Sequence, residues 1–304
     1  MDTPAPREES DETRIATEAW SPRLPEAHGF EHQVVETPGL RSHVATIGKG
    51  DPVVLLHGFP QHWWQWRAVG PLLADRGYRA ICLDLRGAGW TKAADARIDR
   101  DARRRDIVAV LDALGIERAH FLTHDMGAIA GIQVAYMHPE RVRSMVQLST
   151  PPFFMDFVPK LVPAFTHIPP LLMHRPGKSL RWIFAPEYAA QPMSEETVRA
   201  YLDVPPETGG AVREFYRHMV MSEMIRIIRG DYKRMLLEPP TLVAFGRHDH
   251  PFTEQTVRRI CRAHPRCAAH MEFAFIEDAS HYITDDAPDA VADLAVDWFE
   301  RMGS

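Results

Sequence analysis

The sequence predicts an α/β protein in which a mostly parallel sheet is flanked by helices and interrupted by a helical insertion. Strand-like and helix-like runs alternate along the chain from about residue 30. Such alternation is typical of βαβ units, whose strands form a parallel sheet. It stops near Ser149, gives way to helix-like segments rich in Pro, Met and aromatic residues, and resumes after Pro240. We therefore expect one α/β domain with an inserted lid of roughly 90 residues.

The first strand-like runs predict one edge and the centre of the sheet. Residues 33–36 and 42–47 are expected to form a short antiparallel pair around a turn at Pro38 and Gly39. Residues 52–56 are apolar on both faces, as in buried parallel strands. Before the insertion, the sequence further predicts helices over residues 63–76, 100–114 and 126–137 and strands over residues 79–83, 119–123 and 142–148.

The insertion and the C-terminal part are expected to differ in secondary structure. The clearest segments of the insertion, residues 178–184, 195–201 and 211–229, are predicted to be helices. After the insertion, the sequence predicts strands over residues 241–245 and 271–276 and helices over residues 254–264 and 288–301.

These elements define the expected domain organisation. Residues 30–149 and 238–304 form the α/β core, and residues 150–237 form the helical cap. Two independent domains are disfavoured, because the last strands and helices are too few to bury a core of their own. Residues 1–29 are expected to be a flexible tail, since the acidic first residues offer little apolar surface to offset ordering.

Composition excludes several classes of partner. The chain has 35 basic and 41 acidic side chains and a formal net charge of -6, so attraction to nucleic acid is not expected. No apolar run reaches the roughly 18 to 20 residues of a membrane span. The three cysteines form no CxxC pair and the N-terminus does not resemble a secretory signal, so we expect a cytoplasmic protein. The oligomeric state stays open, a homodimer included.

Asp125 is the leading candidate for a nucleophile. It lies between a predicted strand and a predicted helix, in the run Thr-His-Asp-Met-Gly, with the layout of a nucleophile elbow. Free N–H groups at a helix N-terminus favour an ionised carboxylate, which can attack without a base to deprotonate it. The alternative for Asp125 is a simple helix N-cap.

Three further segments favour catalysis over capping. The loop His-Gly-Phe-Pro after the first buried strand is expected to bring the backbone N–H of Phe59 to the elbow, where the N–H of Met126 completes an oxyanion hole. Asp249 and His281 each follow a late strand. Nucleophile, acid and histidine then occur in the chain order of this architecture. Taken singly, His281 could be a surface histidine and Asp249 a loop-capping acid.

Other polar clusters give weaker predictions. His124, His248 and His250 flank the expected triad, and their side chains are expected to point away from it. No HExxH motif or paired CxxC supports a metal site, so no metal or other cofactor is expected. The run of arginines from Arg103 to Arg105 is expected to be a solvated helix face.

Together these segments resemble the α/β-hydrolase superfamily, and more narrowly its epoxide hydrolase and dehalogenase branch, which uses an Asp nucleophile. The resemblance covers the chain after about residue 30. It rests on HGFPQHWWQWR at residues 57–67, DLRGAG at 84–89, HDMGA at 124–128 and EDASHYITDDAP at 277–288. The chain departs from the branch at Thr123 and at Ser280, where Gly is usual.

The resemblance implies hydrolysis of an epoxide to a vicinal diol. Asp125 would form a covalent ester, and water activated by His281 with Asp249 would hydrolyse it. Epoxide hydrolases of this kind also hold the epoxide oxygen with two lid tyrosines, and residues 209–217 resemble the helix that carries one of them, Tyr216. An aromatic residue that only packs the lid is the alternative for Tyr216.

The second lid position stays open between three residues, Phe165, His167 and Tyr188. Trp63, Phe165 and His167 are expected to contact the substrate. Aromatic residues around them predict an apolar pocket that suits a small alkyl or aryl epoxide, and they are Phe59, Trp63, Phe153, Phe154, Phe165 and Trp182.

Two other functions remain as alternatives. A haloalkane or haloacid dehalogenase would share the same three catalytic residues but needs halide donors, which Trp63, Trp64 or Trp182 could supply. Met126 stands where haloalkane dehalogenases carry a halide-binding Trp, which weakens this alternative. The second alternative is a ligand-binding or biosynthetic protein on the same scaffold, since a fold does not fix a function.

Overall fold

A nine-stranded mixed sheet forms the centre of the part of the chain that the computed structural model describes, residues 22–95, 97–185, 189–206, 208 and 211–303. The strand order is β1-β2-β4-β3-β6-β7-β8-β9, and β5 pairs with β2. The strands are β1 (Glu31–Thr37), β2 (Leu40–Ile47), β3 (Asp51–Leu56), β4 (Tyr78–Leu83), β5 (Lys92–Ala93), β6 (Ala119–His124), β7 (Val142–Leu148), β8 (Thr241–Gly246) and β9 (Met271–Ile276).

The sheet is parallel except at the N-terminal edge. β1 pairs with β2 and β2 with β4 in antiparallel fashion, whereas β4, β3, β6, β7, β8 and β9 run parallel to one another. All six residues of β6 and of β8 are buried. Strands covered on both faces read as continuous apolar runs, which is why the sequence indicated them. The predicted fold class and the predicted antiparallel pair are confirmed.

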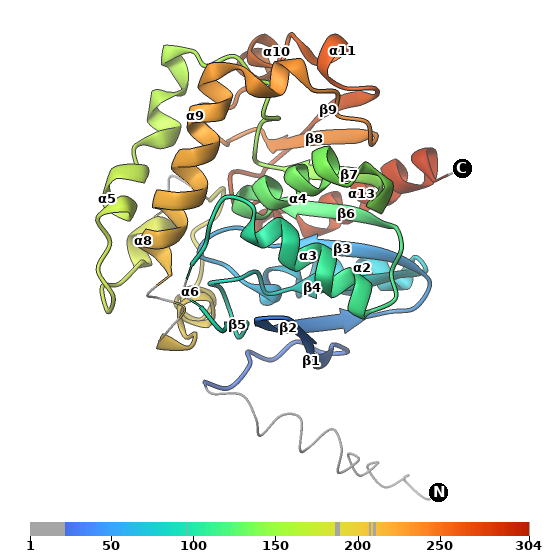
Figure 1. Cartoon of the computed structure of the whole chain (residues 1–304), viewed down its shortest axis with the longest axis vertical. Helices are drawn as coiled ribbons and strands as arrows, with labels where there is room; N and C mark the ends of the chain where they lie inside the picture. The colour runs from blue at the N-terminus through green and yellow to red at the C-terminus, as the bar shows by residue number, and fades with distance from the viewer. Residues whose placement is uncertain (1–21, 96, 186–188, 207, 209–210, 304) are drawn as a thin grey trace, which may run out of the picture.

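Helices cover both faces of the sheet (Figure 1). On one face α3 and α4 pack against each other, and on the other face α2 packs against α13. Each face has its own buried hydrophobic cluster. The helices of the core are α2 (Val69–Asp75), α3 (Ala102–Ala113), α4 (Asp125–Met137), α10 (Glu254–Ile260), α11 (His264–Cys267), α12 (Ile283–Asp286) and α13 (Pro288–Met302).

Two predicted core helices are broken in the structure. The expected helix over residues 63–76 is a 3-10 turn, Trp63–Trp66, followed by the separate helix α2. The expected helix over residues 254–264 ends at Ile260, and α11 is a separate short turn. Pro265 at the start of α11 has no backbone N–H to continue the preceding helix.

The residues between β7 and β8 form a helical cap at the end of the sheet (Figure 1). Its helices are α5 (Ile168–Leu172), α6 (Glu195–Leu202), α8 (Val212–Phe215) and α9 (Met221–Arg229). The helix expected over residues 211–229 is divided by a π-helical segment, Tyr216–Val220. The helix expected over residues 178–184 is only a 3-10 turn, Arg181–Phe184, because Pro176 and Gly177 immediately before it disfavour a helix.

A buried carboxylate joins the cap to the core. Glu223 of α9 is 1% exposed and accepts hydrogen bonds from Arg100 Nη1 at 3.1 Å and Gln133 Nε2 at 2.8 Å. Tyr232 donates to its second oxygen. Because a buried charge is stable only when its hydrogen bonds are satisfied, this group fixes α9 over α3 and α4.

Part of the segment that we expected to be a flexible tail packs against the core. Residues 1–21 lie outside the described residues, but residues 22–29 run along the core. Trp90 donates its indole N–H to the carbonyl of Pro22 at 2.7 Å, and Trp64 donates to the carbonyl of Glu26 at 2.9 Å. Leu24 and Ala27 pack on the hydrophobic cluster of that face. These contacts supply the apolar surface that the acidic first residues lack.

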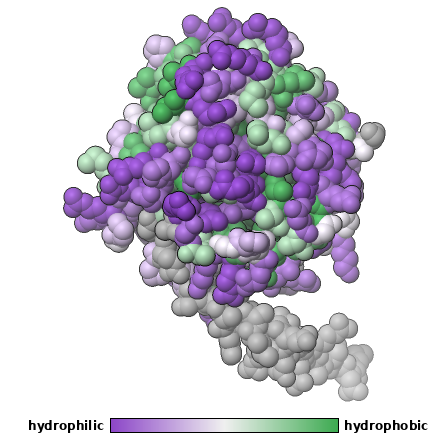
Figure 2. Space-filling view, in the orientation of Figure 1, coloured by the Kyte–Doolittle hydropathy of each residue, from purple (hydrophilic) through white to green (hydrophobic). Residues whose placement is uncertain are grey.

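The molecular surface matches the charged composition. The face in Figure 2 is mostly hydrophilic, with scattered apolar patches. Among the described residues, no helix has the length and apolar character needed to cross a membrane.

Candidate active site

Asp125 lies at a sharp turn where β6 ends and α4 begins. Its φ of 47° is in the left-handed region, which is uncommon for a residue with a side chain and is typical of functional turns. A Cβ on Gly127 would collide with the carbonyl oxygen of Leu56, and a Cβ on Gly58 would lie 2.5 Å from Nδ1 of His124. Glycine at both positions therefore lets the loop after β3 approach the elbow closely.

Thr123 replaces the glycine that is usual before the elbow, and the structure shows how it fits. A Cβ on Gly131, nearly two turns into α4, would lie 2.7 Å from Cγ2 of Thr123. The missing side chain at Gly131 thus makes room for the larger residue at position 123.

The Asp125 carboxylate is held from two sides. Its Oδ1 accepts a hydrogen bond from the backbone N–H of Phe59 at 3.0 Å, and its Oδ2 lies 3.7 Å from Nε2 of His281. Helix α4 begins at Asp125 itself, so this side chain does not act as the N-cap. The carboxylate is 17% exposed, which leaves it partly open to a cavity.

His281 lies between two carboxylates. Its Nδ1 is 3.5 Å from Oδ2 of Asp249, whose side chain is 6% exposed. The structure therefore brings the three residues together in the order Asp125, His281, Asp249. A histidine placed this way can take a proton at Nε2 while Asp249 holds its orientation.

Backbone contacts fix the loop that carries His281. The carbonyl oxygen of His281 accepts hydrogen bonds from Nε2 of His124 at 2.8 Å and from Oγ of Ser149 at 3.0 Å. The His124 side chain is fully buried and points toward this loop, whereas we expected it to point away. Sequence analysis missed the role of Ser149, although its place directly after β7 was a signal.

The charges of Asp125 and His281 stabilise each other. Burial raises the pKa of Asp125, but the hydrogen bond and charge of His281 outweigh burial and hold that pKa well below its usual range. Burial lowers the pKa of His281, but the charges of Asp249 and Asp125 raise it by more, to about 10. At neutral pH the resting site thus contains a carboxylate and an imidazolium.

Two small cavities of about 120 and 70 Å³ share Asp125 and His281 as lining residues. The larger is mainly apolar, with Met126, Ile129, Phe153 and Phe165 in its wall. The smaller is lined by Tyr216, Leu171, Trp182 and Phe252. His167 lines both. An apolar cavity with a few convergent polar groups is typical of a small-molecule site.

Two cap residues face the nucleophile. Tyr216 begins the π-helical segment and is 1% exposed, and burial with the nearby charge of Asp125 raises its pKa well above its usual value. The rings of Tyr216 and His167 lie 6.3 Å apart. Burial lowers the pKa of His167, so its imidazole is neutral at neutral pH. Tyr216 can therefore donate a hydrogen bond into the smaller cavity, whereas the neutral His167 has one N–H, which can donate either there or to the backbone of Ala164.

The structure corrects the expectation that Trp63 contacts the substrate. Its side chain is fully buried in the cluster on the other face of the sheet, where it packs edge-on against Phe30 and His32. Asp84 accepts a hydrogen bond from the Trp63 backbone at 2.7 Å and fixes the turn in this orientation. Because its side chain lies on the other face of the sheet, Trp63 is not placed to donate a hydrogen bond to a halide at Asp125.

Other expected pocket residues are divided between the cavities and the core. Phe154 is completely buried in the core. Trp64 donates its indole N–H to the backbone carbonyl of Glu26 and so does not face the cavities. His250, which we expected to point away, lines the smaller cavity, while His248 is exposed. Phe252 lines both cavities and was not predicted. Tyr188, one candidate for the second lid position, lies outside the described residues.

Across the described residues, no group of three or more His, Cys, Asp or Glu side chains is arranged to hold a metal ion. The elbow, histidine and acid are set on a mostly parallel sheet with a helical cap, and this arrangement is typical of one fold family. A model of the alpha/beta hydrolase fold matches residues 51–288. The chain belongs to the alpha/beta hydrolase fold family.

Within this family the chain is similar to epoxide hydrolases. It is 41% identical over 122 residues to epoxide hydrolase 2 of Siraitia grosvenorii, in an alignment that covers 40% of this chain and 39% of the relative. It is 37% identical over 128 residues to epoxide hydrolase B of Mycobacterium tuberculosis, and that alignment covers 40% of this chain and 35% of the relative. These alignments span about two-fifths of the length of the relatives.

The structural similarity extends further along the chain. A solved structure of a candidate epoxide hydrolase from Pseudomonas aeruginosa superposes with a TM-score of 0.76 and 28% sequence identity, and the match covers 92% of this chain and 98% of that one. The likeness therefore includes the cap as well as the core.

Proposed function

We propose that the protein hydrolyses a small apolar epoxide to a vicinal diol through a covalent ester at Asp125. The observation that carries the proposal is the environment of this carboxylate. One oxygen is held by the Phe59 N–H, the other faces His281, and Tyr216 and His167 of the cap line the same cavity.

In the first step Oδ2 of Asp125 attacks an epoxide carbon, and the carbon–oxygen bond of the ring breaks. Oδ1 stays with Phe59 and becomes the ester carbonyl oxygen. The leaving oxygen needs a donor, because an unassisted alkoxide is a poor leaving group. Tyr216 is protonated at neutral pH and supplies this hydrogen bond and proton, and His167 is the second donor.

In the second step water hydrolyses the ester. Ester formation removes the negative charge of Asp125, one of the charges that raise the pKa of His281. The imidazolium then gives up its proton, which restores the Tyr216 hydroxyl through solvent. The neutral imidazole, held by Asp249, accepts a proton from water as the water oxygen attacks the Asp125 ester carbon. The N–H groups of Phe59 and Met126 stabilise the oxyanion on Oδ1.

The tetrahedral intermediate then collapses toward products. The bond between the ester carbon and the alkyl oxygen breaks, and that oxygen takes the proton from His281. The diol leaves with one former carboxylate oxygen. Asp125 has gained an oxygen from water and passes the proton of its new carboxyl group to His281, which restores the resting carboxylate and imidazolium. This scheme uses no metal or other cofactor.

The cavity walls support an apolar alkyl or aryl substrate. Ile129, Phe153, Phe165 and Phe252 line the space next to the nucleophile, and Glu223 is the carboxylate there besides Asp125 among the described lining residues. Glu223 is already fully engaged with Arg100, Gln133 and Tyr232. A charged substrate group next to the epoxide would therefore find no free partner in this cavity.

A dehalogenase is less well supported by the same geometry. Of the three tryptophans considered as halide donors, Trp63 and Trp64 are engaged elsewhere, and Trp182 lines the smaller cavity. A ligand-binding or biosynthetic protein on the same scaffold would not convert an epoxide to a diol, so the product distinguishes this alternative.

A product assay separates these functions. Styrene oxide and the corresponding halohydrin are supplied to the wild type and to Asp125→Asn. The proposal expects diol from the epoxide, little halide from the halohydrin and no turnover by the variant. Halide release faster than diol formation would establish the dehalogenase instead, and binding without either product would support the third function.

A further inference from the structure

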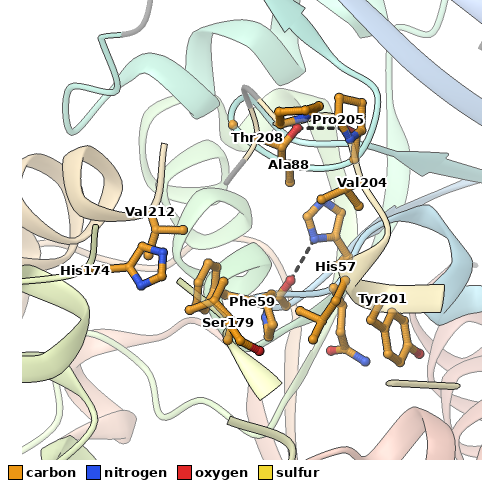
Figure 3. A pocket seen from close by; sticks show the side chains of 18 of the residues that line it. His57, Phe59, Ala88, His174, Ser179, Tyr201, Val204, Pro205, Thr208 and Val212 are labelled. Carbon is orange, nitrogen blue, oxygen red and sulfur yellow. Dashed lines mark hydrogen bonds between the residues drawn. The ribbon is translucent and has the colours of Figure 1, made fainter. Parts of the chain in front are cut away.

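A cavity of about 370 Å³ lies between the core and the cap, next to Phe59, and Asp125 is not among its described lining residues. The loops after β3 and β4 form one wall, and cap segments form the other. Figure 3 shows His174 and Val212 on one side, Tyr201 on the other, and Phe59 with His57 between them. Phe59 also lines the smaller cavity at Asp125, so the two spaces adjoin at this residue.

Arg103 of α3 lines this larger cavity and has an unusual environment for an arginine. We expected it on a solvated helix face, but it is only 3% exposed. Its Nε and Nη2 donate to the carbonyl oxygen of Arg86 at 3.0 and 2.9 Å. Its guanidinium carbon lies 4.0 Å from the centroid of the Phe215 ring.

Within the described part of the chain, no carboxylate forms an ion pair with Arg103. The nearby carboxylate of Asp106 is held by Arg86 in two hydrogen bonds, at 2.7 and 2.9 Å. A guanidinium has five N–H donors, and only two are used here. Burial lowers the pKa of Arg103 to about 9, so the group is still charged at neutral pH. A buried charge without a counterion is costly.

The rest of the cavity suggests which counterion it accepts. Its other basic side chains are Lys178, which is exposed, His174, and the buried His57, whose pKa is lowered by burial, and none of its described lining residues is Asp or Glu. The remaining wall is largely apolar, with Phe59, Leu180 and Val212. Arginine favours a planar carboxylate, with which it can form two parallel hydrogen bonds.

We propose that this cavity binds an amphipathic monocarboxylate, with its carboxylate on Arg103 and Lys178 and its apolar part against Phe59, Leu180 and Val212. The acid is either a separate ligand or the far end of a substrate whose epoxide lies beyond Phe59. Only the second source rests on the proposed function.

The binding test uses decanoate as the probe and calorimetry as the measurement. The wild type is expected to bind decanoate, and Arg103→Met is expected to lose at least about tenfold in affinity. Arg105→Met is the matched control, since Arg105 lies on the same helix but is 54% exposed and pairs with Asp99. It should bind as the wild type does. Decanol should bind the wild type and Arg103→Met equally.

Lys178→Met provides a second test that does not depend on the folding of the Arg103 variant, because Lys178 is exposed. It should weaken decanoate binding severalfold and leave decanol binding unchanged. Failure of the wild type to bind decanoate at millimolar concentration would overturn the proposal. Equal decanoate affinity in the wild type and in either cavity variant would also overturn it.

Two further measurements distinguish the sources. Asp125→Asn should still bind decanoate. The binding proposal can therefore hold even if the proposed epoxide hydrolysis is disproved. A terminal epoxide with a distal carboxylate is then compared with its methyl ester. If the acid is the substrate's own end, Arg103→Met raises KM for the acid alone. If decanoate binding falls but KM changes equally for acid and ester, the ligand is separate.

Discussion

The backbone N–H of Phe59 donates a hydrogen bond of 3.0 Å to Oδ1 of Asp125. The loop after β3 and the elbow after β6 are 66 residues apart in the chain but adjacent in the sheet, because β3 pairs with β6. In the proposed mechanism this contact leaves Oδ2 as the attacking oxygen and places a donor where the ester carbonyl would develop negative charge.

His281→Gln should separate the two chemical steps. Glutamine cannot accept a proton from water, whereas attack by Asp125 does not need the imidazole as a base. Incubation with styrene oxide is expected to leave a stable adduct of one substrate mass on the protein, seen by intact mass spectrometry. Asp125→Asn serves as the control and should show none. A His281→Gln protein that turns over without an adduct would remove His281 from ester hydrolysis.

The charge of Asp125 should control the titration of His281. In the wild type the imidazole is expected to titrate near pH 10. Asp125→Asn mimics the neutral ester, so the pKa of His281 should fall, although Asp249 still raises it. Nitrogen-15 NMR of the imidazole measures both values. An unchanged pKa would contradict the proposed release of the proton after ester formation.

The same pair gives stability a definite pH dependence. Because the folded-state pKa of His281 exceeds its usual 6.5, its contribution is complete below about pH 6.5 and is lost as the pH rises through 10. The pKa of Asp125 is lowered, so its contribution is present above pH 3.8 and is lost on acidification. Both contributions are complete between about pH 3.8 and 6.5. The denaturant midpoints of the wild type and of Asp125→Asn should therefore differ most in this pH range.

Tyr216→Phe tests the acid role of the cap. Removal of the hydroxyl should slow formation of the ester by about 10²- to 10⁴-fold, since this is the usual contribution of a general acid. His167→Phe should slow the same step by less, because Tyr216 remains. Rapid-quench measurement of the adduct in the His281→Gln background isolates this step. An unchanged rate of ester formation in Tyr216→Phe would show that Tyr216 only packs the cap.

Gly131 should respond to substitution in the opposite way to an ordinary helical glycine. Alanine usually stabilises a helix interior by about 1 kcal/mol relative to glycine. Here the added Cβ meets Cγ2 of Thr123, so Gly131→Ala should destabilise by about 1 to 3 kcal/mol. In a Thr123→Ser background, which lacks that methyl group, the loss should shrink. Urea unfolding of the four proteins measures this coupling.

The grouping of the three candidate catalytic residues could be predicted because each follows the end of a strand. Parallel strands present their carboxyl ends at one edge of the sheet, so Asp125, Asp249 and His281 are brought together by topology alone. The apolar runs of β3 and β8 are strong signals, and the structure has these strands within one residue of the expected positions.

Side-chain direction outside regular elements was much harder to predict. Trp63 lies in a 3-10 turn, whose orientation is fixed by Asp84 from a distant loop. The π-helical segment at Tyr216 changes the phase of a helix that looks continuous in the sequence. Arg103 belongs to a run of charges, yet a covering cap buries it. In each case tertiary contacts override the local pattern.

The most direct test of the central proposal follows oxygen into Asp125. Excess enzyme is incubated with styrene oxide in water enriched in oxygen-18, and the peptide that contains Asp125 is weighed after digestion. The account predicts a gain of label in this carboxylate after a single turnover, and diol that carries no label in that turnover. Label confined to the diol, with an unlabelled Asp125 peptide, would show direct attack by water and would contradict the covalent mechanism.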